Sequence, residues 1–558
     1  MEEEDIGAID NGVAWHYSKI AALKAKRNSL APISSLPNEL LSRILTIYAV
    51  ESDSLFDLKW TKIMYVCRHW HALALAAQPL WAFISLDRNG ISRVLRQISH
   101  SGVSPLTIQI AHLVFDIAFY IGIILTESER IYSLEVAGEA QHVYDFIGRI
   151  QNHSLPILSS LILDLSYKRE ELPDGFVQAL PYIIFDGRLR SLRELSLKAV
   201  AFPWRLVSNL EVLCMTDSLD SSSSTPSTLG DLLSVLESCP QLHTLKLDSV
   251  IPTPIPDMHC SPVDLPFLAV LHLRGSIPFC TALLNHILLP ATSTLEVIPF
   301  GVCVGADIKS ILIPIRKHIR APGAPRTSLL EIDSHKLGAD RYSHYTISFF
   351  TKTTLTHTNP PLSINCHPAT ENAVRQLLSK VIKTVPFEAI THLDLCLAME
   401  AGEVTWKMML KLLPALQMVY LQANTGGINF VRVLTQMETT ARKSTPHLRC
   451  LHIRFFRPWQ GNDRVSELLE PLEEYFRIRR VNANVLQTVE FMDRDGLLSN
   501  HKGSLERLFH MMCGAGTIIR DGQEFDPVKA MELRTMAEEE QKMLLGELGE
   551  IPQLQSQE

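Results

Sequence analysis

Two histidines that lie two residues apart, His69 and His71, are of a type that binds metal ions. Their surroundings predict a helix, on which residues two apart point to different faces, whereas neighbours on one face are three or four apart. The adjacent pairs His259–Cys260 and Cys366–His367 have no further ligands nearby, and a structural zinc site usually takes four. We therefore interpret the two histidines as part of a polar helix face and predict no metal site.

The cysteines are scattered singly, and none forms a C-x-x-C pair. This spacing gives no support for a zinc ribbon or a dithiol redox motif. In a chain of this size we expect most of them to be buried reduced thiols, which predicts a reducing compartment, the cytoplasm or the nucleus. The ten cysteines lie at positions 67, 214, 239, 260, 280, 303, 366, 396, 450 and 513.

No motif in the chain predicts catalysis. The stretch that begins at Gly514 lacks the third glycine and the lysine that a phosphate-binding loop needs. Neither a G-x-S-x-G nor an H-E-x-x-H motif occurs. Members of a catalytic triad can lie far apart in sequence, so an enzyme with an unrecognised site remains a third alternative. The prediction is a protein without catalytic residues and without a cofactor.

The composition is that of an ordinary folded protein that is too long for one core. A chain of 558 residues predicts two or more domains or a solenoid. The net charge is −8, and no basic stripe of the kind that binds nucleic acid is present. The first ten residues are acidic and contain no apolar segment, so we expect no secretory signal.

One segment, Leu106–Thr126, is long and apolar enough to cross a bilayer. Asp116 lies near its middle, where a charge is costly. We therefore predict a strand at Leu106–Ile110, followed by a helix from about residue 114 to residue 125 that packs inside the protein. No membrane partner is expected.

The segment Ile33–Trp81 has the clearest local pattern. Ser34 and Ser35 suit a helix cap and Pro37 suits a first turn, which predicts a helix start here. Two apolar stripes at helical spacing follow, and about fifty residues make a poor independent core, so we expect part of this surface to find a partner. A helical hairpin that buries both stripes within the protein is the alternative. The stripes are Leu36, Leu40, Leu41, Ile44, Leu45 and Tyr48, and then Ile63, Val66, Cys67, Trp70 and Leu73.

Three pieces of this segment, LPNELLSRIL, VCRHW and PLW, resemble the F-box in sequence and in order. The connector Ala49–Trp60 is longer than in compact F-boxes and resembles that of fungal members, as does the preceding lead-in. The resemblance implies docking on the S-phase-kinase-associated adaptor of cullin–RING ubiquitin ligases. It places the adaptor contacts on Leu36, Pro37, Leu40, Leu41, Ile44, Leu45, Val66, Cys67, Trp70, Leu80 and Trp81.

Beyond Trp81 the pattern L-x-x-L-x-L recurs, with other apolar residues allowed at the leucine positions. Many intervals fall between 26 and 34 residues, with outliers of 18 and 38, and helical stretches lie between several of the copies. Strands that alternate with helices in this way resemble degenerate leucine-rich repeats and predict a right-handed parallel coil. A non-repetitive α/β domain is the alternative. The copies begin at Ile131, Leu158, Leu192, Leu210, Leu242, Leu268, Leu295, Ile390, Leu416, Leu448 and Leu486.

Side chains alternate along a strand, so the residues between the buried leucines share the opposite face. We predict that this face binds a target protein, whereas for any single residue a plain solvated surface is the alternative. The candidates are Glu194, Ser196, Lys198, Thr244, Lys246, Asp248, His272, Arg274, Tyr420, Gln422, His452 and Arg454.

Together these patterns predict an α+β protein. It has a lead-in helix over residues 1–32, a small all-α F-box-like module over 33–86, and an α/β leucine-rich-repeat-like solenoid over 87–500 with an insertion near 301–389. Capping helices and a tail would cover 501–558. The F-box resemblance implies the function of a substrate-recognition subunit of an SCF-type E3 ubiquitin ligase. The alternative is a repeat-based interaction scaffold that acts without a ligase.

Overall fold

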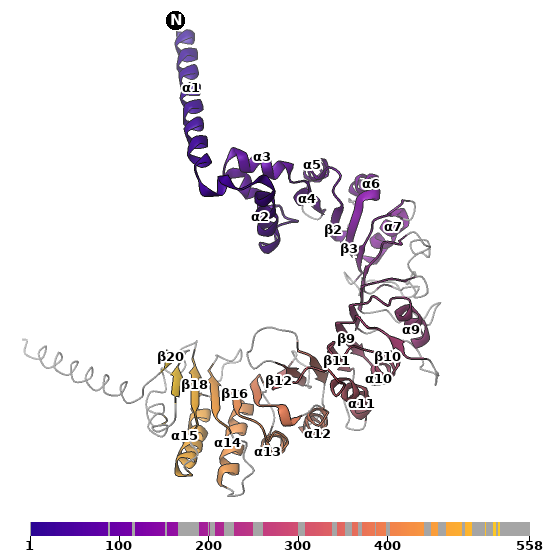
Figure 1. The fold of residues 1–558 in the computed structure, drawn as a ribbon, viewed down its shortest axis with the longest axis vertical. Helices are drawn as coiled ribbons and strands as arrows, with labels where there is room; N and C mark the ends of the chain where they lie inside the picture. Colours follow the sequence, from indigo (N-terminus) through magenta and orange to yellow (C-terminus); the bar gives the residue numbers. More distant parts are fainter. Residues whose placement is uncertain are drawn as a thin grey trace, which may run out of the picture. The chain divides into compact units, whose positions relative to one another are not determined.

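The computed structural model has two compact units, residues 1–253 and 254–558, which we describe separately (Figure 1). The residues described are 2–86, 90–113, 118–150, 153–165, 189–198, 200, 207–216, 228–248, 261–299, 307–336, 343–351, 360–366, 371–384, 387–397, 402–439, 448–455, 465–482, 486–493, 508, 517–520 and 523–524. Of the predicted capping region, 501–558, the structure describes only residues 508, 517–520 and 523–524.

The first unit begins with α1, Glu2–Ser29, followed by the 3₁₀ turn η1, Pro32–Ser35, and by α2, Asn38–Glu51. The predicted cap of α2 is wrong, because Pro37 occupies the N-cap and no side chain caps the helix. The hydroxyl of Ser34 instead donates to the carbonyl oxygen of Asn28, and that of Ser35 donates to Pro32. The two serines therefore stabilise the turn that precedes the helix.

The second apolar stripe does not form a single helix. The 3₁₀ helix η2, Lys59–Tyr65, is separated from α3, Arg68–Ala76, by a break at Cys67. Cys67 is extended, with φ at −161°, and its sulfur accepts a hydrogen bond from the backbone N–H of Trp70 at 3.5 Å. Helix α3 ends before Pro79, which lies in the first turn of the short helix α4, Gln78–Trp81.

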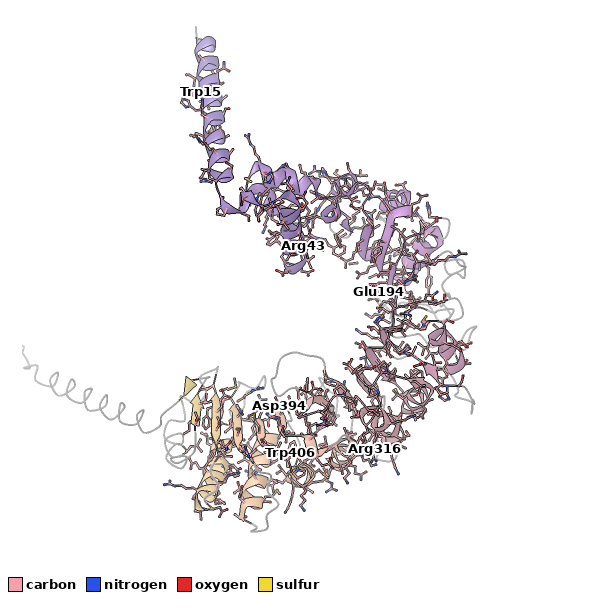
Figure 2. All side chains as sticks on the ribbon, in the orientation of Figure 1. Trp15, Arg43, Glu194, Arg316, Asp394 and Trp406 are labelled. Carbon is pink, nitrogen blue, oxygen red and sulfur yellow. The ribbon has the colours of Figure 1, made fainter. Side chains whose placement is uncertain are left out.

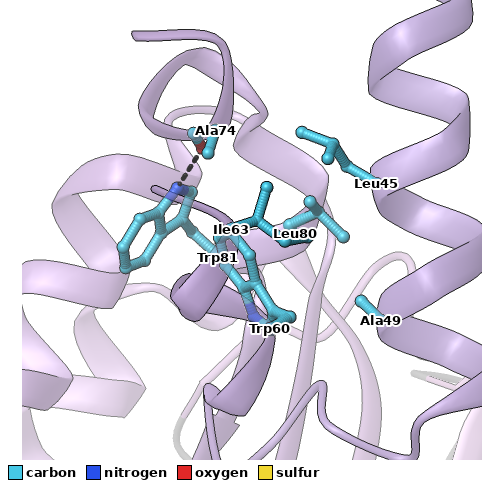
Figure 3. Packing of buried hydrophobic residues seen from close by; sticks show 7 residues of the cluster. All are labelled: Leu45, Ala49, Trp60, Ile63, Ala74, Leu80 and Trp81. Atoms are coloured by element: carbon cyan, nitrogen blue, oxygen red, sulfur yellow. Dashed lines mark hydrogen bonds between the residues drawn. The ribbon is translucent and has the colours of Figure 1, made fainter. Parts of the chain in front are cut away.

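The core of this small module forms around two tryptophans (Figure 3). The rings of Trp60 and Trp81 meet edge to face with centroids 5.1 Å apart, and the indole N–H of Trp81 donates to the carbonyl oxygen of Ala74 at 2.9 Å. Leu45 and Ala49 reach this core from α2. The long connector, Ala49–Trp60, ends at the fully buried Trp60, which belongs to the same core cluster as Leu45 and Ala49 of α2.

The strands of the first unit form a parallel sheet in which each strand pairs with the next along the chain. Equivalent leucines lie side by side in the register, as in the row of Leu195, Leu213 and Leu245, which are fully buried. The helix α9 begins with a capping box in which Thr228 and Asp231 bond to each other's backbone N–H. The strands are β1 Phe83–Ser85, β2 Leu106–Leu113, β3 Ile131–Gly138, β4 Ser160–Asp164, β5 Glu194–Lys198, β6 Val212–Thr216 and β7 Thr244–Asp248. The helices are α5 Ile91–Ser101, α6 Ala118–Thr126, α7 Ala140–Ile150 and α9 Leu229–Glu237, with the 3₁₀ turn η4 Ser128–Arg130.

The apolar segment from residue 106 to residue 126 forms β2 and α6. The predicted change from strand to helix is confirmed, although the strand is three residues longer than expected. Among the described residues no helix is both long and apolar enough to cross a membrane.

The second unit also contains one large sheet, and helices line up along it (Figure 1). Together the two units give a mixed helix-and-strand architecture with predominantly parallel pairing. The strands are β9 Val270–Gly275, β11 Thr294–Pro299, β12 Leu329–Lys336, β13 Ser343–Phe350, β14 Leu362–Cys366, β15 His392–Leu397, β16 Met418–Gln422, β17 Cys450–Arg454, β18 Thr488–Met492, β19 Thr517–Arg520 and β20 Gln523–Glu524, and β8 Val263–Asp264 pairs with β10 Ile287–Leu288. The helices are α10 Ile277–His286, α11 Asp307–Ile319, α12 Glu371–Ile382, α13 Glu403–Leu412, α14 Thr425–Thr439 and α15 Val465–Val481, with the 3₁₀ turn η7 Phe387–Ala389.

The insertion between β11 and β15 continues the sheet. Strand β14 pairs in parallel with β11, β13 pairs antiparallel with both β14 and β12, and β12 pairs in parallel with β15. The sheet order is therefore β11–β14–β13–β12–β15, in which β13 alone runs against the other four. The sheet therefore continues through the predicted insertion near 301–389, in which the leucine pattern does not recur.

Each of the eleven copies of the leucine pattern overlaps a strand of this parallel pairing, and the first residue of most copies lies just before the strand. One of them is displaced. The strand β11 buries Leu295, Val297 and Pro299, whereas the pattern places Leu295 and Ile298 inward together. Val297, Ile298 and Pro299 are consecutive apolar residues, so the sequence alone does not show which of them point inward. The pairing with β9, in which Glu296 lies opposite His272, determines which residues are buried.

Candidate functional site

Helix α2 has two apolar faces. One face, formed by Leu41, Leu45 and Ala49 at a spacing of four, is at most 1% exposed. The other consists of Leu40, Ile44, Ile47 and Tyr48, which are 39–48% exposed. We call these four residues the outer face of α2. A helix that is apolar on both sides while only one side is covered has surface to offer a partner.

The residues that the F-box resemblance assigns to the adaptor are divided by the structure. Leu41, Leu45, Leu80 and Trp81 are buried in the module. Leu36, Cys67 and Trp70 are half-buried, and Pro37, Leu40, Ile44 and Val66 are exposed. The first set builds the module, and in this conformation only the second and third sets are accessible to a partner.

On the first unit, the predicted target-binding residues lie on the strand face as expected. Glu194, Ser196, Thr244 and Asp248 are half-buried between buried neighbours, and Lys246 is exposed. The amino group of Lys198 lies 3.2 Å from the carboxylate of Asp164, its register partner on β4. This ion pair is partly exposed, so it contributes little stability.

On the second unit, one row of side chains crosses nine neighbouring strands in register. Residues paired directly across a sheet point to the same face, so these side chains share one surface. The row is His272, Glu296, Ser363, Ser348, Glu331, Asp394, Tyr420, His452 and Glu490. We call it the polar row. Its register passes through the inserted strands β14, β13 and β12 without a break.

Neighbours in the first half of the polar row are joined by hydrogen bonds. Nδ1 of His272 lies 2.9 Å from the Oε2 atom of Glu296, and the hydroxyls of Ser348 and Ser363 are 3.3 Å apart. Both serines are buried, whereas Glu296 is 44% exposed. This half is therefore open to solvent at the His272 end.

The second half contains an aromatic and charged cluster. The rings of Tyr420 and His452 stack with centroids 4.6 Å apart. The guanidinium of Arg454, on the same strand face, lies 5.5 Å from the centre of the Tyr420 ring and 3.9 Å from the carboxylate of Asp394. His452 also bonds through Nδ1 to Glu490. We call Glu331, Asp394, Tyr420, His452, Arg454 and Glu490 the strand-face cluster.

Negative charge dominates this cluster. Burial, together with the nearby carboxylates of Asp394 and Asp333, raises the pKa of Glu331 to about 7, although Arg454 opposes the rise. The same burial raises the pKa of Tyr420. Carboxylates that repel one another in a half-buried site are stabilised by an approaching cation, so the electrostatics favour a positively charged ligand group.

Among the described residues, two nitrogens of the cluster have no hydrogen-bond partner. Nε2 of His452 and Nε of Arg454 are both buried and unbonded. The side chains of His452 and Arg454 as a whole are 13% and 20% exposed. Nε of Arg454 is a donor, whereas Nε2 of His452 can accept a hydrogen bond in the tautomer whose Nδ1–H donates to Glu490.

Three of the predicted target-binding residues, Tyr420, His452 and Arg454, come together here, and Gln422 lies next to Arg454 in the register. His272 and Arg274 are on β9, at the other end of the row. Asp394 and Glu490 were not among the predicted residues, although the pattern could have identified them. Each lies between two buried residues of a recognised copy of the leucine pattern. The sequence had no signal for Glu331, which belongs to an inserted strand outside the repeat pattern.

Of the metal-ligand pairs considered from the sequence, the structure describes both members only for His69 and His71. His69 and His71 are both exposed on α3. In the part of the chain that the structure describes, no group of three or more histidine, cysteine or acidic residues has the geometry to hold a metal ion. His259, Cys260 and His367 lie outside that part.

Comparison with known proteins yields little. No family model matches the chain, and no curated protein matches it. Among solved structures the chain is similar to the leucine-rich repeat-containing protein LegL7 from Legionella pneumophila. The identity is 14% and the TM-score 0.24, and the match covers 57% of this chain and 86% of that one.

Proposed function

We propose that this protein is a substrate-recognition subunit of an SCF-type ubiquitin ligase. Residues 33–86 dock on the S-phase-kinase-associated adaptor, and the sheet face holds a target protein. The subunit itself performs no chemistry. It raises the local concentration of a target beside the ligase, which is the logic of tethering.

The outer face of α2 is the observation that carries the proposal. The module already has a core, in which Leu45 and Leu80 pack with Trp60 and Trp81, so the outer face is not needed to complete it. Two further apolar side chains are exposed where the VCRHW piece begins. Val66 is its first residue and Tyr65 precedes it, and they are 60% and 88% exposed. Large apolar groups exposed in this number, on a segment that resembles the F-box, support an adaptor interface.

Adaptor binding is the test of this half of the proposal. The purified chain should retain the adaptor, and the double substitution of Leu40 and Ile44 by alanine should weaken binding at least tenfold, because it removes the centre of the outer face. Replacement of Leu36 and Pro37 by alanine should also abolish retention. Arg43→Ala, an exposed change on the same helix, is the matched control and should bind normally.

Adaptor retention by the unsubstituted chain is the deciding measurement. If this chain does not retain the adaptor under conditions in which a known F-box protein does, the ligase function is wrong. In that case the repeat-based scaffold, our second candidate, gains support from the continuous polar row alone. Circular dichroism of each variant separates a lost contact from a lost fold.

The strand-face cluster supports a target segment that carries lysine or arginine. Glu331, Asp394 and Glu490 supply three carboxylates, against which Arg454 is the one guanidinium of the cluster. The ring of Tyr420 adds a flat apolar surface beside them. Cation-bearing side chains gain from carboxylates and from aromatic faces together.

Target capture tests this second half. In a chain without residues 33–86, captured targets are not passed to a ligase, so proteins bound to it can be identified by mass spectrometry. Tyr420→Ala and Glu490→Gln should each reduce capture of the same proteins. A charge reversal on the first unit, Lys246→Glu, changes an exposed residue far along the chain from the cluster. If only this last change reduces capture, the target surface lies on the first unit.

A further inference from the structure

Helix α1 has the sequence pattern of a two-stranded coiled coil. Apolar residues recur along it at spacings of three and four, which is the heptad pattern that aligns one seam along a helix. The seam residues are Ile6, Ile9, Val13, His16, Ile20 and Leu23. Five of the six are apolar, and the one exception, His16, falls in the middle.

This seam is uncovered in the isolated chain. Ile6, Ile9, Val13, Ile20 and Leu23 are 47–68% exposed. Figure 2 shows side chains standing out around α1, with Trp15 labelled. A helix of 28 residues with this much exposed apolar surface is stabilised when the seam is buried, because apolar surface is then removed from water.

The charges along α1 identify the occupant. Residues 1–10 carry five carboxylates and no basic side chain, whereas residues 19–27 carry four basic side chains and no carboxylate. Two such helices side by side in parallel bring acid against acid and base against base. Turned end for end, each acidic half lies along a basic half, and the flanking charges of a coiled coil set its orientation in this way.

We propose that α1 pairs with α1 of a second copy of this chain as an antiparallel coiled coil. In the register that aligns the two seams, Ile6 lies opposite Leu23 of the second copy, Ile9 opposite Ile20, and Val13 opposite His16. Lys24 and Lys26 then flank the acidic first turns of the second copy. The pairing leaves the outer face of α2 and the strand-face cluster untouched, so it does not depend on the function proposed above.

Mass measurement of the full-length chain in solution tests the pairing. At micromolar concentration the parent chain should have the mass of a dimer, and Val13→Asp with Ile20→Asp should convert it to a monomer. The matched control is Trp15→Asp, because Trp15 is 57% exposed but lies off the seam, where Lys19 covers its ring at 5.3 Å. That variant should remain a dimer.

The orientation needs a separate variant. Lys24→Glu with Lys26→Glu leaves two basic and two acidic side chains in residues 19–27. The acidic half of the second copy then has no net positive charge opposite it, which should weaken an antiparallel dimer at least tenfold at low salt. A parallel dimer would be strengthened, because the repulsion between its basic halves is removed. Mixing this variant with a chain whose carboxylates in residues 1–10 are all replaced by lysine should give a mixed dimer. A monomeric parent chain, or a dimer that survives the aspartate pair in the seam, would overturn the pairing, and indifference to the lysine changes would overturn the antiparallel arrangement.

Discussion

Glu331 lies directly opposite Asp394 in the register of β12 and β15. Asp394 is almost fully buried, and its charge adds to the effect of burial on the Glu331 carboxyl, whose pKa rises to about 7. Two acidic groups at one position of a sheet are a source of instability when both are ionised. A sheet built for stability alone would not place them there.

The first prediction follows from that pair. The native Glu331 carboxyl binds its proton up to about pH 7, whereas in the unfolded chain it loses the proton near its ordinary pKa of 4.5. Between these values the native state binds more protons, so stability falls as the pH rises. Glu331→Gln should therefore leave the free energy of unfolding unchanged near pH 4 and raise it by about 1–2 kcal/mol at pH 8, after allowance for partial exposure.

Chemical denaturation at the two pH values measures this difference. The measurement near pH 4 is the internal control, since there the parent carboxyl is neutral like the amide that replaces it. A gain of equal size at both pH values would show that the substitution acts through packing, and not through the charge of Glu331.

The second prediction separates the two faces of α2. Leu45→Ala removes a side chain that is 1% exposed and packs in the tryptophan core, so it should lower the free energy of unfolding by about 2–5 kcal/mol. Its neighbour Ile44 is 39% exposed, and Ile44→Ala should cost no more than about 0.5 kcal/mol. Thermal unfolding compares the pair, and equal losses would mean that the outer face is part of the core.

The strand positions were predictable because they depend on local pattern. Alternation along five residues is enough to bury Leu195 and Leu245 and to expose the residues between them. The same rule brought Tyr420, His452 and Arg454 to one face. The function of the connector before Trp60 was not predictable, because nothing near this tryptophan in sequence shows that it packs against Trp81.

The remainder depended on contacts between distant segments. The phase of β11 is set by its pairing with β9 and β14, although its own residues are apolar at adjacent positions. Glu331 enters the polar row because β12 pairs with β15, about sixty residues further along the chain, and the string around Glu331 does not reveal that partner. Of the strand-face cluster, Tyr420, His452 and Arg454 were therefore predicted from the sequence, whereas Glu331, Asp394 and Glu490 were not.

The third prediction concerns a glycine that holds helix and sheet close together. A Cβ atom at Gly427 in α14 would lie 2.2 Å from the carbonyl oxygen of Gln422, at the end of β16. Gly427→Ala should therefore destabilise the second unit by about 1–3 kcal/mol, since backbone must move. Gly148 in α7 has nothing within 4 Å of the same position. There Gly→Ala should be neutral or stabilise the first unit by up to about 1 kcal/mol. Thermal melts should therefore show a lower melting temperature for Gly427→Ala and no decrease for Gly148→Ala.

The fourth prediction concerns a buried ion pair between α14 and α15. The guanidinium of Arg479 lies 3.1 Å from the carboxylate of Glu438, and both side chains are at most 6% exposed. Arg479 also donates to the hydroxyl of Tyr475 at 2.8 Å and to the carbonyl oxygen of Leu448 at 3.2 Å. The pair therefore connects two helices with the start of the β17 repeat.

Removal of one partner should cost more than removal of both. Glu438→Gln leaves the buried guanidinium without its counter-charge and should lower the free energy of unfolding by about 3–5 kcal/mol. In the double variant Glu438→Leu with Arg479→Met, apolar groups of similar size replace the pair, and the loss should shrink to about 1 kcal/mol or less. Denaturation of the parent and the two variants makes the comparison. If the double variant is at least as unstable as the single one, the hydrogen bonds of Arg479 to Tyr475 and Leu448 hold the helices together, and the ion pair does not.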